Sequence, residues 1–305
     1  MSVPDIFGRP LQPDPSVALK PCTLPRALPG PQHKVQYVVE IVGPRTMPAE
    51  AAKACLDVQW RNALGEPDIY VMAGSDDHWR TFDATDQAGA YDSLVFAWDL
   101  VSTRGALSSA AAQNLLNVAE QFAKAVSRRA MPMPPPADVE PAVRAIEDAA
   151  QNLDIGMGLS LLPLGNPLPE KDVWIACAAL GLQVGGSGLF EWRVPEWDEP
   201  LLTLSSLDDQ ETFSLQAVTA GKGHPGLSVG YRIPRSPNSL AVLQACMQIA
   251  DYFERALSTA TLDDSDEQLD AAGKQRLIGY HGQAVAALRA VGLEPGSPAA
   301  LKVFR

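Results

Sequence analysis

Cysteine and histidine are scarce in this sequence, and neither residue type is grouped. The four cysteines are far apart without a C-x-x-C pair, and the four histidines are each isolated. A metal site needs several such ligands at short spacing, and a disulfide framework needs paired cysteines. We therefore expect no bound metal and reduced, mostly buried cysteines, which favours a reducing compartment.

Basic residues are fewer than acidic ones, and no apolar run is long enough to cross a membrane. Lys and Arg number 24 against 36 Asp and Glu, which gives a net charge of -12. A nucleic-acid binder needs a basic surplus, so we expect no nucleic-acid partner, whereas an acidic chain attracts a basic motif. The longest uncharged run, residues 173–190, is broken by "GGSG", and the Pro-rich start lacks a signal-peptide core. We expect a cytoplasmic chain without a transmembrane segment.

Two short matches to catalytic motifs fail on position. "GLSVG" (residues 226–230) fits G-x-S-x-G, but that nucleophile must lie on a turn after a strand, and Ser228 lies within a predicted strand. "GKGHPG" (residues 221–226) fits a dinucleotide-binding loop, but it precedes a strand, and Pro225 removes a backbone donor. Neither match predicts a catalytic or cofactor-binding site.

The acidic segments give no site either. "DDSDE" (residues 263–267) fails as a calcium loop, because the sixth position counted from Asp264 is Leu269 and not Gly. The carboxylates of "LSSLDDQE" (residues 204–211) have no histidine or lysine partner fixed by spacing. We therefore predict a non-enzyme with no catalytic residues, cofactor or metal. An enzyme or small-molecule binder is the least favoured alternative.

Proline-rich breaks divide the chain, whose length of 305 residues predicts about two domains. The first 32 residues hold eight prolines, and "MPMPPPADVEP" (residues 131–141) is a second break. We predict a Pro-rich extended tail (1–32), a first α+β unit (33–131), a linker with a helix (132–153), a second α+β unit (154–293) and a C-terminal tail (294–305).

The two predicted units repeat one order of elements. In each, a main strand (residues 93–101 and 227–233) leads through a turn into a long amphipathic helix, and apolar positions of the two strands are 133 residues apart. We predict an internal duplication; the alternative is that two α+β domains share a generic order by chance. The short connections between strands favour antiparallel sheets. The predicted fold class is α+β, with two tandem split β-α-β units, each an antiparallel sheet backed by helices on one face.

Alternation along the second main strand assigns its side chains to faces. Strand residues point to opposite faces in turn. If Leu227, Val229 and Tyr231 pack against helices, then Ser228 and Gly230 face outward. A trough of small residues on a sheet can hold an amphipathic peptide.

The second unit, from about residue 154 to 293, resembles the C-terminal domain of ZipA, the bacterial division protein that binds the C-terminal tail of FtsZ. The first unit resembles it more weakly, and residues 1–32 are not covered. The segments that carry the resemblance are "LPEKDVWIACAALGLQVGGSGLFEW", "PLLTLSSLDDQETF", "HPGLSVGYRIP", "LQACMQIADYFERAL" and "LDDSDEQL".

The resemblance implies an antiparallel sheet backed by three helices, with the peptide held on the exposed sheet face. The family places a large aromatic residue at Gly230 and a large apolar residue at Ser187, so we expect a shallower, more polar groove here. Carried over by position, the peptide-binding residues are Ile155, Met157, Ser187, Ser205, Leu207, Ser228 and Gly230.

The resemblance implies a non-enzymatic interaction module of bacterial cell division. We expect it to bind the FtsZ C-terminal tail, or a similar peptide of another division protein, and to be recruited to the division site. ZipA itself has an N-terminal membrane helix and a linker; this sequence has neither, so we expect a soluble relative, with removal of an anchor as the alternative. The alternative function is a soluble scaffold or adaptor whose duplicated units pack their sheet faces together and bind no FtsZ.

Overall fold

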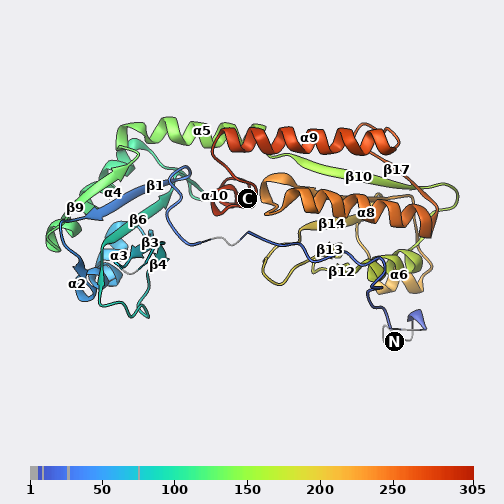
Figure 1. The fold of residues 1–305 in the computed structure, drawn as a ribbon, viewed down its shortest axis with the longest axis horizontal. Helices are drawn as coiled ribbons and strands as arrows, with labels where there is room; N and C mark the ends of the chain where they lie inside the picture. The colour runs from blue at the N-terminus through green and yellow to red at the C-terminus, as the bar shows by residue number, and fades with distance from the viewer. Residues whose placement is uncertain (1–5, 9, 26–27, 75) are drawn as a thin grey trace. The chain divides into compact units, whose positions relative to one another are not determined.

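The computed structural model describes residues 6–305 except 9, 26, 27 and 75, and they form two compact units (Figure 1). Unit A comprises residues 26–152, 291–293 and 297–305, as far as they are described. Unit B comprises the described part of residues 1–25, together with residues 153–290 and 294–296. Both units are discontinuous in sequence.

Unit B is built on a six-stranded antiparallel sheet in the order β12-β13-β14-β16-β10-β17. Helix α8 packs against β10, β16 and β17, while α6 and α9 pack against α8. The strands are β10 (Gly156–Pro163), β12 (Gln183–Val184), β13 (Phe190–Trp192), β14 (Leu202–Ser206), β16 (Leu227–Arg232) and β17 (Thr259–Leu262); the helices are α6 (Glu170–Leu180), α7 (Leu215–Thr219), α8 (Ser239–Leu257) and α9 (Ala271–Ala290).

The ends of these helices follow from local sequence. Helix α6 starts directly after Pro169 and ends at Gly181, whose φ of 86° is the left-handed cap that glycine adopts without strain. Helix α8 is capped by Asn238, whose side-chain oxygen accepts a hydrogen bond from the Ala241 N–H.

Unit A has a five-stranded antiparallel sheet in the order β4-β3-β6-β1-β9. Helix α4 covers one side of it, where Phe122 packs on Phe96 with ring centroids 5.4 Å apart. The strands are β1 (Gln36–Val42), β3 (Asp68–Met72), β4 (Arg80–Thr81), β6 (Ser93–Asp99), β9 (Arg129–Met133) and the short pair β7 (Val101–Ser102) and β8 (Gly105–Ala106); the helices are α2 (Ala49–Lys53), α3 (Val58–Leu64), α4 (Ser109–Ala125), α5 (Val139–Asn152) and α10 (Pro298–Val303).

The two sheets share one strand order. Strands β3-β6-β1-β9 of unit A match β14-β16-β10-β17 of unit B, so the first strand of each unit lies between its main strand and its last strand. Each unit also has a two-residue ladder before its main strand: β2 (Met47–Pro48) with β5 (Ala90–Tyr91), and β11 (Leu168–Pro169) with β15 (Gly223–His224). The predicted α+β class, with antiparallel sheets backed by helices, is confirmed.

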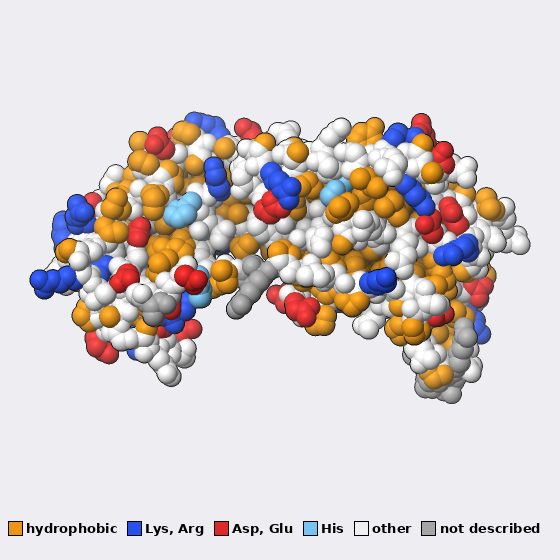
Figure 2. All heavy atoms as spheres, viewed as in Figure 1, with side chains coloured by type: hydrophobic (Ala, Val, Ile, Leu, Met, Phe, Trp, Pro, Cys, Tyr) orange, Lys and Arg blue, Asp and Glu red, His pale blue; other side chains and the backbone are white. Residues whose placement is uncertain are grey.

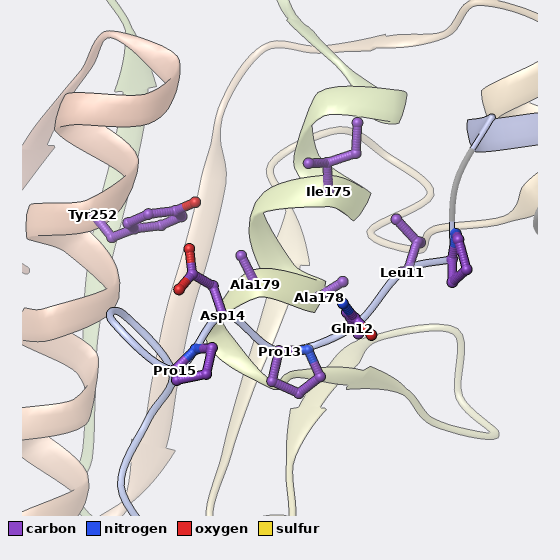
Figure 3. Close-up of a pocket in the computed structure, with 10 residues that line it drawn as sticks. Leu11, Gln12, Pro13, Asp14, Pro15, Ile175, Ala178, Ala179 and Tyr252 are labelled. Atoms are coloured by element: carbon purple, nitrogen blue, oxygen red, sulfur yellow. The ribbon is translucent and has the colours of Figure 1, made fainter.

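Three segments that we predicted as tails or a linker are packed against the units. In the N-terminal segment, the backbone N–H groups of Asp14 and Leu19 donate to the last carbonyls of α6, at Ala179 (2.9 Å) and Leu180 (3.0 Å). The prolines flanking Asp14 line a cavity of about 350 Å³ against α6 and Tyr252 of α8 (Figure 3). The predicted linker forms α5, and the last residues form α10; both pack in unit A.

Candidate peptide-binding face

The main strand of unit B alternates as its sequence predicts. Leu227, Val229 and Tyr231 are buried on the side of the sheet that α8 covers, where Tyr231 lies near Cys246 of α8. Ser228 and Gly230 are only half-buried. They therefore lie on the opposite side of the sheet, which we call the open face.

Register places small residues side by side across three strands of the open face. Two neighbouring rows run from β14 through β16 to β10. We call this patch the small-residue floor, and its members are Ser205, Ser228 and Ser160 in one row and Thr203, Gly230 and Gly158 in the next. A Cβ at Gly230 would lie 2.9 Å from the backbone oxygen of Met157, so a larger residue would displace β10. The close approach of the β10 backbone therefore leaves no room for a side chain at position 230.

Leucines border one side of the floor. Leu207 and Leu162 come together over Gly226, where an added Cβ would meet their methyl groups at 2.9 and 2.8 Å. Leu207 is 45% exposed, although a leucine side chain gains free energy from burial. This leucine edge offers apolar contact to a ligand lying on the floor.

Two ion pairs border the other side of the floor. Arg232 Nε donates to Asp154 Oδ1 at 3.0 Å, and Arg235 Nε donates to Glu199 Oε2 at 2.9 Å. With Gly230 and its neighbours, the arginines line a cavity of about 220 Å³. On the face drawn in Figure 2, Lys and Arg side chains are scattered among Asp and Glu, as far as the residues are described.

Four of the seven predicted binding residues lie on the open face, and three do not. Ser205, Ser228 and Gly230 are in the floor, and Leu207 is in the leucine edge. Ser187 lies in the loop before β13, where its hydroxyl donates to Glu191 Oε1 at 3.4 Å.

Met157 and Ile155 require a correction. Met157 is paired in register with Tyr231, and its side chain is 8% exposed on the helix-covered side. Ile155 is two residues away in an extended segment and points to that same side. The open-face residues of β10 are instead Gly158, Ser160 and Leu162, which we missed; alternation within "IGMGLSLL" is the signal that identifies them.

A buried polar cluster near this face was also missed. His224 Nε2 lies 3.1 Å from Glu170 Oε2, while its Nδ1 lies 2.7 Å from Ser206 Oγ and 3.2 Å from Asp208 Oδ2. Lys222 pairs with Asp208 at 2.8 Å. His224 and the carboxylates of residues 204–211 therefore do have partners, contrary to the prediction from spacing.

This cluster stabilises the packing of the elements that it joins, and its burial makes it inaccessible to substrates. Glu170 and His224 have no exposed surface, and Ser206 is 1% exposed. The contacts join the start of α6, the end of β14 and β15. Burial raises the pKa of Asp208, but hydrogen bonds from Lys222, two backbone N–H groups and Ser206 outweigh it and leave the pKa well below its usual range.

Two further features concern the described residues only. They contain no group of three or more His, Cys, Asp or Glu that could hold a metal ion. None of their helices is long and apolar enough to span a membrane.

Unit B is thus an α+β domain with one sheet face under helices and the other open. Residues 157–278, from β10 into α9, match the family model of the ZipA C-terminal FtsZ-binding domain. This match confirms the resemblance for that part of the chain. No curated protein matches the sequence.

Proposed function

We propose that the chain is a non-enzymatic division protein that binds the C-terminal tail of FtsZ, or a similar peptide of another division protein, on the open face of unit B. The observation that supports it is the small-residue floor with its leucine edge, in a segment that matches this family. Exposed Leu207 and half-buried Leu162 give a peptide apolar surface to cover, and the floor leaves room for its side chains.

Affinity is expected to be modest. A peptide on this floor has no large protein side chain to pack on at Gly230 or Ser187. Each missing large contact costs roughly 1–3 kcal/mol of binding free energy.

Titration of the full chain with a fluorescent FtsZ C-terminal peptide tests the proposal. We expect saturable binding that Leu207→Asp weakens at least about tenfold, because a charge replaces an apolar contact. Leu240→Asp is the matched control, since Leu240 is 43% exposed, close to Leu207, but lies on α8. Absence of binding at about 100 μM peptide would overturn FtsZ as the partner and favour the scaffold alternative.

We further propose that the two units arose by duplication, and that the protein is cytoplasmic and recruited to the division site. The shared order of four strands and the paired two-residue ladders support the duplication. A fluorescent fusion that stays diffuse in dividing cells would contradict the recruitment.

A further inference from the structure

The centre of the unit A face that corresponds to the open face of unit B is apolar and buried, while at its β9 edge Met131 and Met133 are 49% and 38% exposed. Val38, Val95 and Ala97 are at most 1% exposed, and Tyr70 beside them is 9% exposed. They alternate with residues such as Phe96, which packs on α4, so they lie on the far side of the sheet. In unit B, the matching positions of β10, β14 and β16 are half-buried small residues.

Trp79 covers this patch. Thr81 pairs with Tyr70, and Trp79 is two residues before Thr81, so its ring lies on the same side as Tyr70. The ring packs against the patch formed by Val38, Tyr70, Val95 and Ala97. Gly30 approaches Trp79 from another segment, since an added Cβ would lie 3.2 Å from Trp79 Cβ.

The segment that carries Trp79 is fixed by ion pairs. Arg80 Nε lies 2.8 Å from Asp76 Oδ2, and Arg80 Nη1 lies 3.2 Å from Asp86 Oδ2. The Tyr91 hydroxyl donates to the other oxygen of Asp86 at 2.6 Å. Trp79 is therefore held next to a paired strand and not on a free loop.

The C-terminal residues close the other end of the same face. Lys302 Nζ lies 2.8 Å from Asp99 Oδ1 and 3.2 Å from Asp68 Oδ2, and Arg305 also binds Asp99 at 2.8 Å. Buried Gln36 donates to both carboxylates, at 2.9 and 3.1 Å. By alternation, Asp68 is on the side of Tyr70, and Asp99 is on the side of Ala97.

We propose that Trp79 and the C-terminal segment close the centre and one end of the unit A sheet face, and that, of the two sheet faces in the described residues, the one in unit B is the peptide-binding face. This inference rests on the proposed function for what unit B binds. A peptide would have to displace Trp79, which is tethered a few residues from its site and so competes at high effective concentration. One chain then holds one peptide and cannot link two tails.

An apolar dye tests the closure without any peptide. The full chain and Trp79→Phe, which keeps a ring, should give equal bis-ANS emission, whereas Trp79→Ala should give a higher emission because it uncovers the patch. Circular dichroism and cooperative thermal unfolding must show that Trp79→Ala is folded. If folded Trp79→Ala binds no more dye than the wild type, or if the wild type binds as much dye as Trp79→Ala, the closure is wrong.

Peptide stoichiometry tests the single site. Isothermal titration with the FtsZ peptide should give one peptide per chain, and Leu207→Asp should weaken that binding at least about tenfold. Two peptides per chain, of which Leu207→Asp weakens only one, would overturn the single site while the proposed function survived. One peptide bound with unchanged affinity by Leu207→Asp would contradict the proposed face in unit B. If no peptide binds, the proposed function fails, and the dye result still decides whether the face of unit A is closed.

Discussion

Met157 and Tyr231 face each other across β10 and β16, and the Tyr231 hydroxyl donates to the Met157 sulfur at 3.6 Å. Their contact lies in the core of unit B beneath α8, and not in the peptide-binding face that position in the family implied. Mutations on the two sides of β10 should therefore separate stability from the proposed peptide binding.

Met157→Ala is expected to lower the free energy of unfolding by about 2–5 kcal/mol, because it leaves a cavity in the core. Urea denaturation measures this. Ser160→Ala, on the open face of the same strand, should stay within about 0.5 kcal/mol of the wild type. Equal effects of the two substitutions would contradict the assignment of faces.

Gly230→Ala should destabilise unit B by about 1–3 kcal/mol, since its methyl group would meet the Met157 carbonyl at 2.9 Å. Ser228→Ala is the neighbouring control, because Ser228 already carries a Cβ on the same face. Thermal unfolding compares the pair. A Gly230→Ala protein as stable as Ser228→Ala would mean that β10 and β16 are farther apart than described.

Acid should destabilise unit B through Asp208. The pKa of Asp208 is lowered in the folded state, so its stabilising effect is present above the ordinary aspartate pKa and is lost as pH falls below about 4. We expect urea unfolding of the wild type to show this loss and Asp208→Asn to be less stable at pH 7 and less sensitive to acid. Parallel pH profiles for the two proteins would rule out this role.

The cysteines should differ in reactivity. Burial raises the pKa of Cys55 and Cys246 to about 12 and that of Cys177 well above its usual value, whereas Cys22 is only partly buried. With a thiol reagent such as DTNB, we expect Cys22 to react first in the native protein and four thiols to react in denaturant. A Cys22→Ser variant that loses no fast phase would contradict this.

The sequence was sufficient for the fold and for one strand of the site. The period-two pattern at Leu227, Val229 and Tyr231 correctly separated the faces of β16. The same pattern in Met157, Leu159 and Leu161 marks a buried face of β10, but transfer by family position put Met157 on the other side.

The buried cluster was not predictable from spacing. His224 is 54 residues from Glu170 and 18 from Ser206. The ladder of β11 with β15 and the pairing of β14 with β16 bring these elements together. The covering of the unit A sheet face by Trp79 and the C-terminal residues was equally unpredictable from the sequence, because Trp79 and Lys302 are separated by most of the chain. Contacts of this kind depend on topology, which no local pattern encodes.

The discontinuity of the units has a consequence for synthesis. A ribosome makes the segment around Asp14 and Leu19 before the helix α6 that binds it, with most of unit A between them. Lys302, which pairs with Asp68 and Asp99, emerges after all of unit B. The N-terminal segment of unit B therefore waits through the synthesis of unit A, and unit A waits through the synthesis of unit B for its C-terminal residues.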